Sequence, residues 1–149
     1  PAEPALEQLE GEAEEPPAGF PTISYAPSGE PTVTIPEGDV PGEFAVATVL
    51  EGTGSVVGAG DVVVVQYHGV NWNTGEVFDS SWARGEPASF PTGGVIPGFR
   101  DGLIDQTVGS RVVIVIPAEL GYGPNGGTAD GSIGPEDTIV FVVDILGVQ

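Results

Sequence analysis

Few side chains in this sequence could do acid–base or nucleophilic chemistry. The chain has 149 residues, with one His, three Arg and neither Lys nor Cys. A Schiff-base lysine, a Walker phosphate loop and a thiolate nucleophile are therefore excluded. A Ser80–His68–Asp79 triad can be written down, but neighbouring strand residues point to opposite faces and no Gly-x-Ser-x-Gly turn surrounds Ser80. We expect no such triad, no metal site and no cofactor.

His68 follows Tyr67 in a Val-rich segment that predicts a strand over residues 61–70. If Tyr67 points inward with Val63 and Val65, His68 lies on the other face of the strand. We expect a surface histidine at this position rather than a catalytic one.

A more distinctive set consists of aromatic and apolar residues separated by Gly and Pro. Its members are Tyr67, Phe78, Val95, Ile96, Phe99, Tyr122, Ile133 and Phe141. Any one of them could simply belong to the core of a β domain. Tyr122 is less expected in a core because it lies in a Gly-rich loop over residues 121–134, and such long loops are usually functional or disordered. Asp79 directly follows Phe78, and a partly buried carboxylate requires a partner such as Arg84.

The charge excludes whole classes of partner. With 22 acidic residues the formal net charge is −19, which excludes a nucleic-acid binder that works by neutralising phosphates. It also argues against adhesion to anionic membranes through a polybasic patch. The longest uninterrupted run of Val or Ile is residues 62–65, too short to span a bilayer. We expect neither a nucleic-acid partner nor a membrane-spanning segment.

Composition divides the chain in two. Residues 1–43 contain 9 of the 15 prolines, 10 of the 22 acidic residues and no basic residue, which predicts an acidic, proline-rich and largely irregular arm or linker. Within this arm, residues 32–35 could dock as an edge strand. Residues 44–149 contain all three Arg and most of the Val and Ile, which predicts a single globular domain large enough for one core.

The pattern within this domain predicts mostly β structure. Strands are predicted over residues 44–50, 61–70, 76–79, 88–90, 111–116 and 138–146. Pro97 suits the first turn of a helix over residues 98–106, and the helical period places Phe99, Leu103 and Ile104 on one face.

The order of several sequence blocks resembles that of the FKBP-type peptidyl-prolyl cis-trans isomerases. These blocks are residues 65–70 with 75–81, then 95–99, 108–111, 116–123 and 138–141. The most diagnostic are Phe-Asp-Ser-Ser at residues 78–81 and Val-Ile-Pro-Gly-Phe at residues 95–99. The resemblance covers residues 44–149, and residues 1–43 lie outside it.

The resemblance implies an α+β fold in which a five-stranded antiparallel sheet forms a half-barrel around one short α-helix. It implies an apolar cleft with two groups of site residues. The catalytic residues would be Tyr67, Phe78, Asp79, Phe99, Tyr122 and Phe141, and the substrate-binding residues Arg84, Val95, Ile96 and Ile133. Asp79 would bridge Tyr67 and Arg84. Phe99 stands where many relatives have Trp, and Ala88 replaces an aromatic residue that often closes the pocket edge.

The implied function is acceleration of Xaa-Pro bond rotation in folding proteins, with rapamycin-like macrolides as possible ligands. One alternative is a proline-recognition or chaperone-like module with little catalysis. Another is a passive β domain that stacks sugars on Trp72 or Trp82. We expect a monomer that acts on Xaa-Pro-containing polypeptides. A flexible arm ahead of the domain favours a secreted or surface-tethered bacterial protein, and a cytoplasmic location is the alternative.

Overall fold

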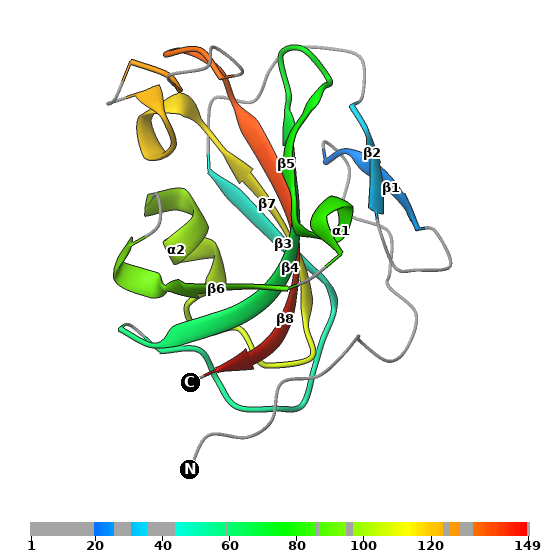
Figure 1. Cartoon of the computed structure of the whole chain (residues 1–149), viewed down its shortest axis with the longest axis vertical. Helices are drawn as coiled ribbons and strands as arrows, with labels where there is room; N and C mark the ends of the chain where they lie inside the picture. Colours follow the sequence, from blue (N-terminus) through cyan, green and yellow to red (C-terminus); the bar gives the residue numbers. More distant parts are fainter. Residues whose placement is uncertain are drawn as a thin grey trace.

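The computed structural model describes the chain from residue 20 to residue 148 with several gaps (Figure 1). The described ranges are 20–25, 31–35, 44–58, 60–85, 87–94, 97–123, 126–128 and 133–148. Strands form most of the regular secondary structure in this part of the chain, as the sequence predicts, and every strand pairing is antiparallel.

The main sheet has the strand order β3-β7-β8-β4-β5, and β6 also pairs with β4. The bounds of these strands are β3 Ala45–Leu50, β4 Val62–Asn71, β5 Val77–Ser80, β6 Ala88–Pro91, β7 Arg111–Ile116 and β8 Ile139–Val148. The sheet has six strands in five positions, because β5 and β6 pair with successive halves of β4. The short helix α1, Ser81–Arg84, lies between them in the chain. The predicted five-stranded α+β architecture is therefore confirmed, with its edge position divided between two short strands.

The helix α2, Pro97–Leu103, packs against β7 on one face of the sheet. Gly98 permits this approach, because a Cβ there would lie 2.5 Å from a side-chain carbon of Ile116. The helix is shorter than predicted. Asp105 has φ 74°, and its N–H donates to the carbonyl of Val57, so the chain leaves the helical path before residue 106. Two 3-10 turns, η1 Thr92–Gly94 and η2 Ala118–Leu120, complete the regular structure.

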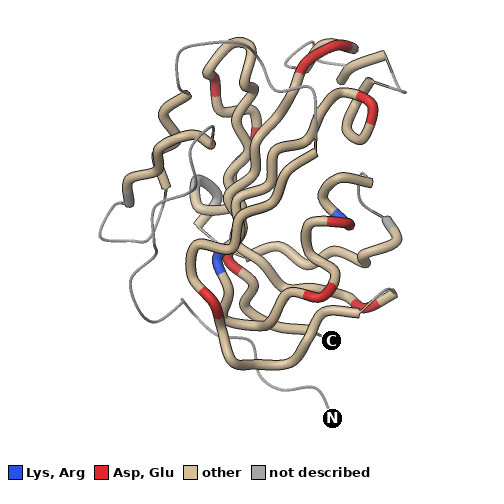
Figure 2. Tube along the Cα trace, turned by 180° about the vertical axis from the view of Figure 1, so that it is seen from behind, with Lys and Arg blue, Asp and Glu red and all other residues tan. Residues whose placement is uncertain are grey.

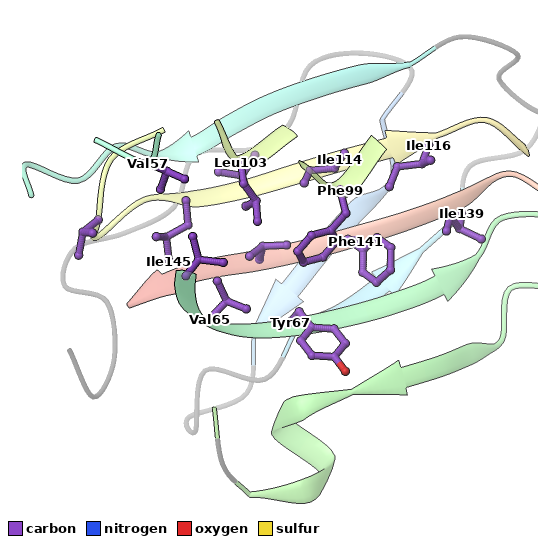
Figure 3. Close-up of a cluster of buried hydrophobic side chains, with 14 of the residues drawn as sticks. Val57, Val65, Tyr67, Phe99, Leu103, Ile114, Ile116, Ile139, Phe141 and Ile145 are labelled. Atoms are coloured by element: carbon purple, nitrogen blue, oxygen red, sulfur yellow. The ribbon is translucent and has the colours of Figure 1, made fainter. Parts of the chain in front are cut away.

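Apolar residues pack on both faces of the sheet. The larger cluster lies on the concave face, between the sheet and α2, and includes Val65, Tyr67, Phe99, Leu103, Ile114, Phe141 and Ile145 (Figure 3). The smaller cluster lies on the convex face and consists of Ala47, Val49, Trp72, Val113, Val115 and Val140. A strand with apolar residues on both sides, such as β7, is buried along its full length. Both faces therefore need a cover.

A hairpin from the N-terminal segment covers part of the convex face. Strands β1 (Thr22–Tyr25) and β2 (Pro31–Thr34) form a separate two-stranded sheet on the side opposite α2 (Figure 1). Phe20, Ile23 and Ile35 pack against the convex cluster. The prediction of a largely irregular arm did not anticipate this hairpin, and residues 32–34 pair with β1 rather than with the edge of the main sheet. The predicted domain boundary after residue 43 stays a prediction.

Removal of the hairpin should destabilise the domain. Burying three large apolar side chains in part contributes about 2–4 kcal/mol, so a chain that begins at Phe44 should melt roughly 10 °C below the full chain. A chain that begins at Phe20 is the matched control and should melt within about 2 °C of the full chain. Thermal unfolding followed by circular dichroism measures both. Equal melting temperatures for all three chains would show that the hairpin adds no stability to the domain.

Candidate functional site

Five aromatic rings meet on the concave face of the sheet. Phe99 from α2 lies over Phe141 from β8, with ring centroids 4.9 Å apart and planes at 90°. The Tyr67 ring is 6.1 Å from Phe141 and 6.3 Å from Phe99 (Figure 3). The Phe78 ring lies 5.5 Å from the Phe141 ring. Every pair is edge-to-face, an arrangement that contributes about 0.5–1.5 kcal/mol per pair beyond the area buried.

Strand register explains why these rings converge. Gly69 of β4 is the direct partner of Phe141 on β8 and of Asp79 on β5. A Cβ at Gly69 would lie 2.6 Å from the Phe78 ring and 2.8 Å from the Phe141 ring. The two rings therefore occupy the space above a glycine, where any larger residue would displace them.

A β-bulge explains how Phe78 and Asp79 both serve the site. Gly69 pairs with Asp79 and the next residue, Val70, pairs with Val77, so Phe78 is an extra residue in β5. A bulge of this kind re-aims side chains that would otherwise alternate between faces. Phe78 thus packs against the concave core cluster although the adjacent Asp79 also faces that side.

A short hydrogen bond joins the two polar residues of the wall. The Tyr67 hydroxyl donates to Asp79 Oδ2 at 2.5 Å. Tyr67 is 6% exposed and Asp79 is half-buried, so this bond lies at the edge of the aromatic cluster. The predicted contact between Tyr67 and Asp79 is therefore present. Arg84 lies in α1, but its side chain lies outside the described part of the structure, so its bridge to Asp79 stays a prediction.

Tyr122 brings a second hydroxyl to the same region. It follows η2, is half-buried and packs against the concave core cluster. Burial raises the pKa of the Tyr122 phenol above its ordinary value of 10.0, and the negative charge of Asp79 raises this pKa further. The Tyr122 hydroxyl therefore stays protonated at neutral pH and can donate a hydrogen bond.

The predicted site residues divide into three groups. Tyr67, Phe78, Asp79, Phe99, Tyr122 and Phe141 come together as described above. Ile133 is 1% exposed and belongs to the same core cluster as the rings, so its role in substrate binding stays a prediction. Val95 and Ile96 lie outside the described residues, and their roles stay predictions.

Sequence reasoning missed Phe90. Its ring lies 5.5 Å from Tyr67 and 6.0 Å from Phe99, and the side chain is half-buried. It reaches the concave face because β6 pairs Val63 with Phe90 and Val65 with Ala88. Strand alternation could have found it, since Phe90 lies two residues beyond Ala88 and therefore on the same face. Phe90 therefore supplies an aromatic ring close to the pocket edge, where Ala88 supplies none.

Two residues on the convex side differ from expectation. His68 was predicted at the surface, but it is 6% exposed and its Nδ1 lies 2.9 Å from Ser80 Oγ. The surface prediction is wrong because β5 pairs Ser80 with His68 on a face that is also buried. Asp79 contacts Tyr67 on the opposite face, so the three residues form no triad. Trp72 is 5% exposed under the hairpin, which removes it as a platform for sugars.

Charge is distributed rather than concentrated. Acidic residues lie mostly in the loops and turns of the described chain (Figure 2). Within that part of the chain, no group of three or more His, Asp or Glu side chains is arranged to hold a metal ion. None of its helices has the length and apolar character needed to cross a membrane.

Comparison with known proteins shows which family this chain resembles in sequence. The model of the family "FKBP-type peptidyl-prolyl cis-trans isomerase" matches residues 54–146. The FK506-binding protein of Streptomyces anulatus is 42% identical over 121 residues, which cover 80% of this chain and 97% of that protein. The isomerase FkpA of Escherichia coli K12 is 43% identical over 101 residues, which cover 68% of this chain but 36% of that protein.

Solved structures of similar proteins support the same family. The crystal structure of FkpA from Escherichia coli superposes with a TM-score of 0.65 at 35% identity, covering 85% of this chain and 51% of that one. A peptidyl-prolyl cis-trans isomerase from Pseudomonas syringae gives a TM-score of 0.63 at 29% identity, covering 71% and 75%. With its motif order, sheet topology and concave aromatic cluster, the chain belongs to the family of FKBP-type peptidyl-prolyl cis-trans isomerases.

Proposed function

We propose that this isomerase rotates Xaa-Pro bonds at the concave aromatic cluster, with Phe99 under the proline ring. The main observation that supports this proposal is the aromatic cluster itself. Phe90 and Phe141 each meet both Tyr67 and Phe99 edge-to-face. The nearby polar groups are the Tyr67–Asp79 hydrogen bond and the Tyr122 hydroxyl. Phe78, Phe90 and Tyr122 are half-buried, so the cluster is open to a ligand at these three rings.

Such a site suits the chemistry of amide rotation. The uncatalysed barrier is about 18–20 kcal/mol because amide resonance must be broken. The reaction takes tens to hundreds of seconds at 25 °C, so a millisecond reaction requires a barrier lower by about 7 kcal/mol. No proton or electron moves, and a site with few titratable groups is therefore sufficient.

Two effects favour the rotated bond. The planar amide is more polar than the twisted one, so apolar rings that exclude water stabilise the twisted form relative to the planar form. Hydrogen bonds to the flanking carbonyls would hold the chain on either side of the bond while it rotates, and the Tyr122 hydroxyl is the described donor best placed to anchor the substrate in this way. The role supported for Asp79 is to hold Tyr67, whose hydroxyl already donates to it.

The same cluster is the proposed macrolide site. Relatives from Streptomyces anulatus and Corynebacterium glutamicum are named for FK506 binding, and each is covered over 97% of its length by this chain. A protease-coupled assay with a prolyl peptide tests the whole proposal. Turnover that FK506 abolishes supports a shared site. Peptide binding without turnover would instead favour the proline-recognition module.

Loss of the Tyr122 hydroxyl should weaken catalysis moderately. Tyr122→Phe removes one neutral hydrogen bond, so we expect kcat/KM to fall about three- to tenfold. Because the pKa of Tyr122 is raised above 10.0, wild-type activity should not change between pH 7 and pH 9.5, and should fall only when the phenol ionises at higher pH. The variant should lack that alkaline fall. NMR exchange spectroscopy of a prolyl peptide measures both without a protease.

Ionisation of the Tyr122 phenol should lower the stability of the fold as well as the activity. A phenol with a raised pKa in the folded state keeps its proton when the unfolded chain has lost it, so stability falls as pH rises through 10. Activity that titrates near pH 8, or a Tyr122→Phe variant with wild-type kcat/KM, would contradict the role given to this hydroxyl.

A further inference from the structure

We propose that Asn71 and Asp137 are positioning residues for the isomerase reaction. Their hydrogen bond ties the segment that carries Tyr122 to the end of β4. The inference rests on the proposed role of Tyr122 as a substrate anchor. Neither Asn71 nor Asp137 belongs to the aromatic cluster, and the sequence patterns did not single out either residue.

The first link joins the sheet to the loop before β8. Asn71 is the last residue of β4 and is 1% exposed. Its Nδ2 donates to Asp137 Oδ2 at 2.9 Å. The same oxygen accepts the backbone N–H of Gly134 at 2.7 Å. One carboxylate therefore closes the turn from Gly134 to Asp137 and fixes that turn to the sheet.

The second link runs from this turn to Tyr122. Ile133 precedes Gly134, and its carbonyl accepts the N–H of Thr128 at 2.8 Å. The N–H of Ile133 donates to Thr128 Oγ1 at 3.0 Å. The neighbouring Gly127 donates its N–H to the carbonyl of Tyr122 at 2.8 Å. The backbone at Tyr122 is thus joined to β4 through hydrogen bonds that are linked by the peptide bonds between Gly127 and Thr128 and between Ile133 and Gly134.

The other end of the Asn71 amide is held as well. Asn71 Oδ1 accepts the N–H of Asn73 at 2.8 Å, and Asn73 Oδ1 accepts the N–H of Thr138 at 3.0 Å. The N–H of Trp72 donates to the carbonyl of Thr138 at 2.9 Å. The turn between β4 and β5 and the loop before β8 therefore form one unit. Because the side chain of Asn71 is buried, it cannot replace these partners with water.

Position matters because a substrate anchor acts only at the correct distance. A displacement of about 1 Å in a group that orients substrate can lower the rate about 100-fold. Tyr122 lies in a loop whose backbone is held by these contacts rather than by a strand ladder. Asn71 and Asp137 act on the reaction through Tyr122 and do not touch the substrate.

The test compares Asp137→Ala and Asn71→Ala with Asp137→Asn. Each alanine variant should lower kcat/KM about three- to tenfold, as Tyr122→Phe does, and the change should appear mainly as a higher KM. Asp137→Asn keeps an acceptor oxygen for Gly134 and Asn71, so it should stay within about twofold of the wild type. A kcat that falls with KM unchanged in the alanine variants would overturn the inference.

A double substitution separates positioning from general destabilisation. In the Tyr122→Phe background, Asp137→Ala should lower kcat/KM by less than about twofold more, because the hydroxyl that it positions is already absent. Full additivity of the two losses would overturn the inference. If Asp137→Ala does not fold, Thr128→Val breaks the same series of contacts further along and should give the same KM signature.

The two proposals fail in different ways. If Tyr122→Phe has wild-type kinetics, the role of Tyr122 in the proposed function is wrong and the positioning inference falls with it. If Tyr122→Phe is impaired but Asp137→Ala and Thr128→Val have wild-type KM values, only the positioning inference is wrong.

Discussion

Phe99→Ala should lower kcat/KM for a prolyl peptide by about tenfold or more, equivalent to about 1.4 kcal/mol of transition-state stabilisation. The Phe99 ring is 4% exposed and contacts Tyr67, Phe90 and Phe141 within 6.3 Å, so its loss opens the floor on which we place the proline ring. Water that enters this space would restore the polar environment that favours the planar amide. The protease-coupled assay at a temperature where the variant is folded measures the effect.

The control for this prediction must lose as much packing without changing the site. A buried Phe replaced by Ala also lowers the free energy of unfolding by about 3–5 kcal/mol. Ile145→Ala is suitable, because Ile145 is fully buried in the same core cluster and its direct partner across the sheet is Val65, which is not a site residue. It should lose about 2–5 kcal/mol of stability and keep its kcat/KM. Equal losses of activity in both variants would show that Phe99 acts only through stability.

The sequence predicted the fold well because its strands carry strong local signals. The Val-rich segments of β4 and β7 lie within one residue of their predicted bounds, and Pro97 begins α2 as expected. The end of α2 was misplaced because the helix ends at Leu103 and the chain turns away at Asp105, a non-glycine residue with positive φ that the helical pattern did not reveal. The hairpin was missed because its strands have four residues each and are stabilised by contacts with the distant convex cluster.

The sequence indicated only those site residues that lie in recognisable sequence blocks. The family resemblance gave Tyr67, Phe78 and Asp79 their roles in the site. Strand alternation would place the neighbours Phe78 and Asp79 on opposite faces, and they share one face only because of the bulge in β5. Phe90 was missed because the alternation that places it on the face of Ala88 was not applied, and its ring contacts come from the pairing of β6 with β4. The contact between Asn71 and Asp137 joins residues 66 positions apart and is equally invisible in one sequence.

Breaking the buried ion pair on the convex face should lower the stability of the fold as much as a large cavity in the core does. Arg111 and Asp144 are direct partners on β7 and β8, and the Arg111 Nε and Nη2 donate to Asp144 Oδ1 and Oδ2 at 2.5 and 2.6 Å. Their side chains are 11% and 5% exposed. Asp144→Ala removes the carboxylate that Arg111 Nε and Nη2 bind and keeps the Arg111 charge buried, so the free energy of unfolding should fall by about 3–5 kcal/mol. Urea unfolding measures this change.

The double variant Arg111→Met/Asp144→Leu should behave in the opposite way. Burial raises the pKa of the Asp144 carboxyl, and the hydrogen bond and charge of Arg111 offset this only in part. Desolvation thus outweighs the attraction, and replacing both residues with apolar ones should be neutral or stabilise the fold by about 1–4 kcal/mol. A raised pKa means that the folded state holds this proton more tightly than the unfolded state. The stability contributed by Asp144 is therefore present at acid pH and is lost as pH rises above 3.8.

The advantage of the double variant over the wild type should accordingly grow between pH 4 and pH 7, because only the wild type has to ionise a carboxyl in this buried position. Arg100 and Asp101 provide the matched control. They form an ion pair at 3.1 Å with side chains 42% and 46% exposed, so Asp101→Ala should change stability by less than about 1 kcal/mol. If Asp144→Ala were as mild as Asp101→Ala, the convex face would be hydrated at Arg111. If the double variant were as unstable as Asp144→Ala, the pair would supply a net attraction that exceeds its desolvation.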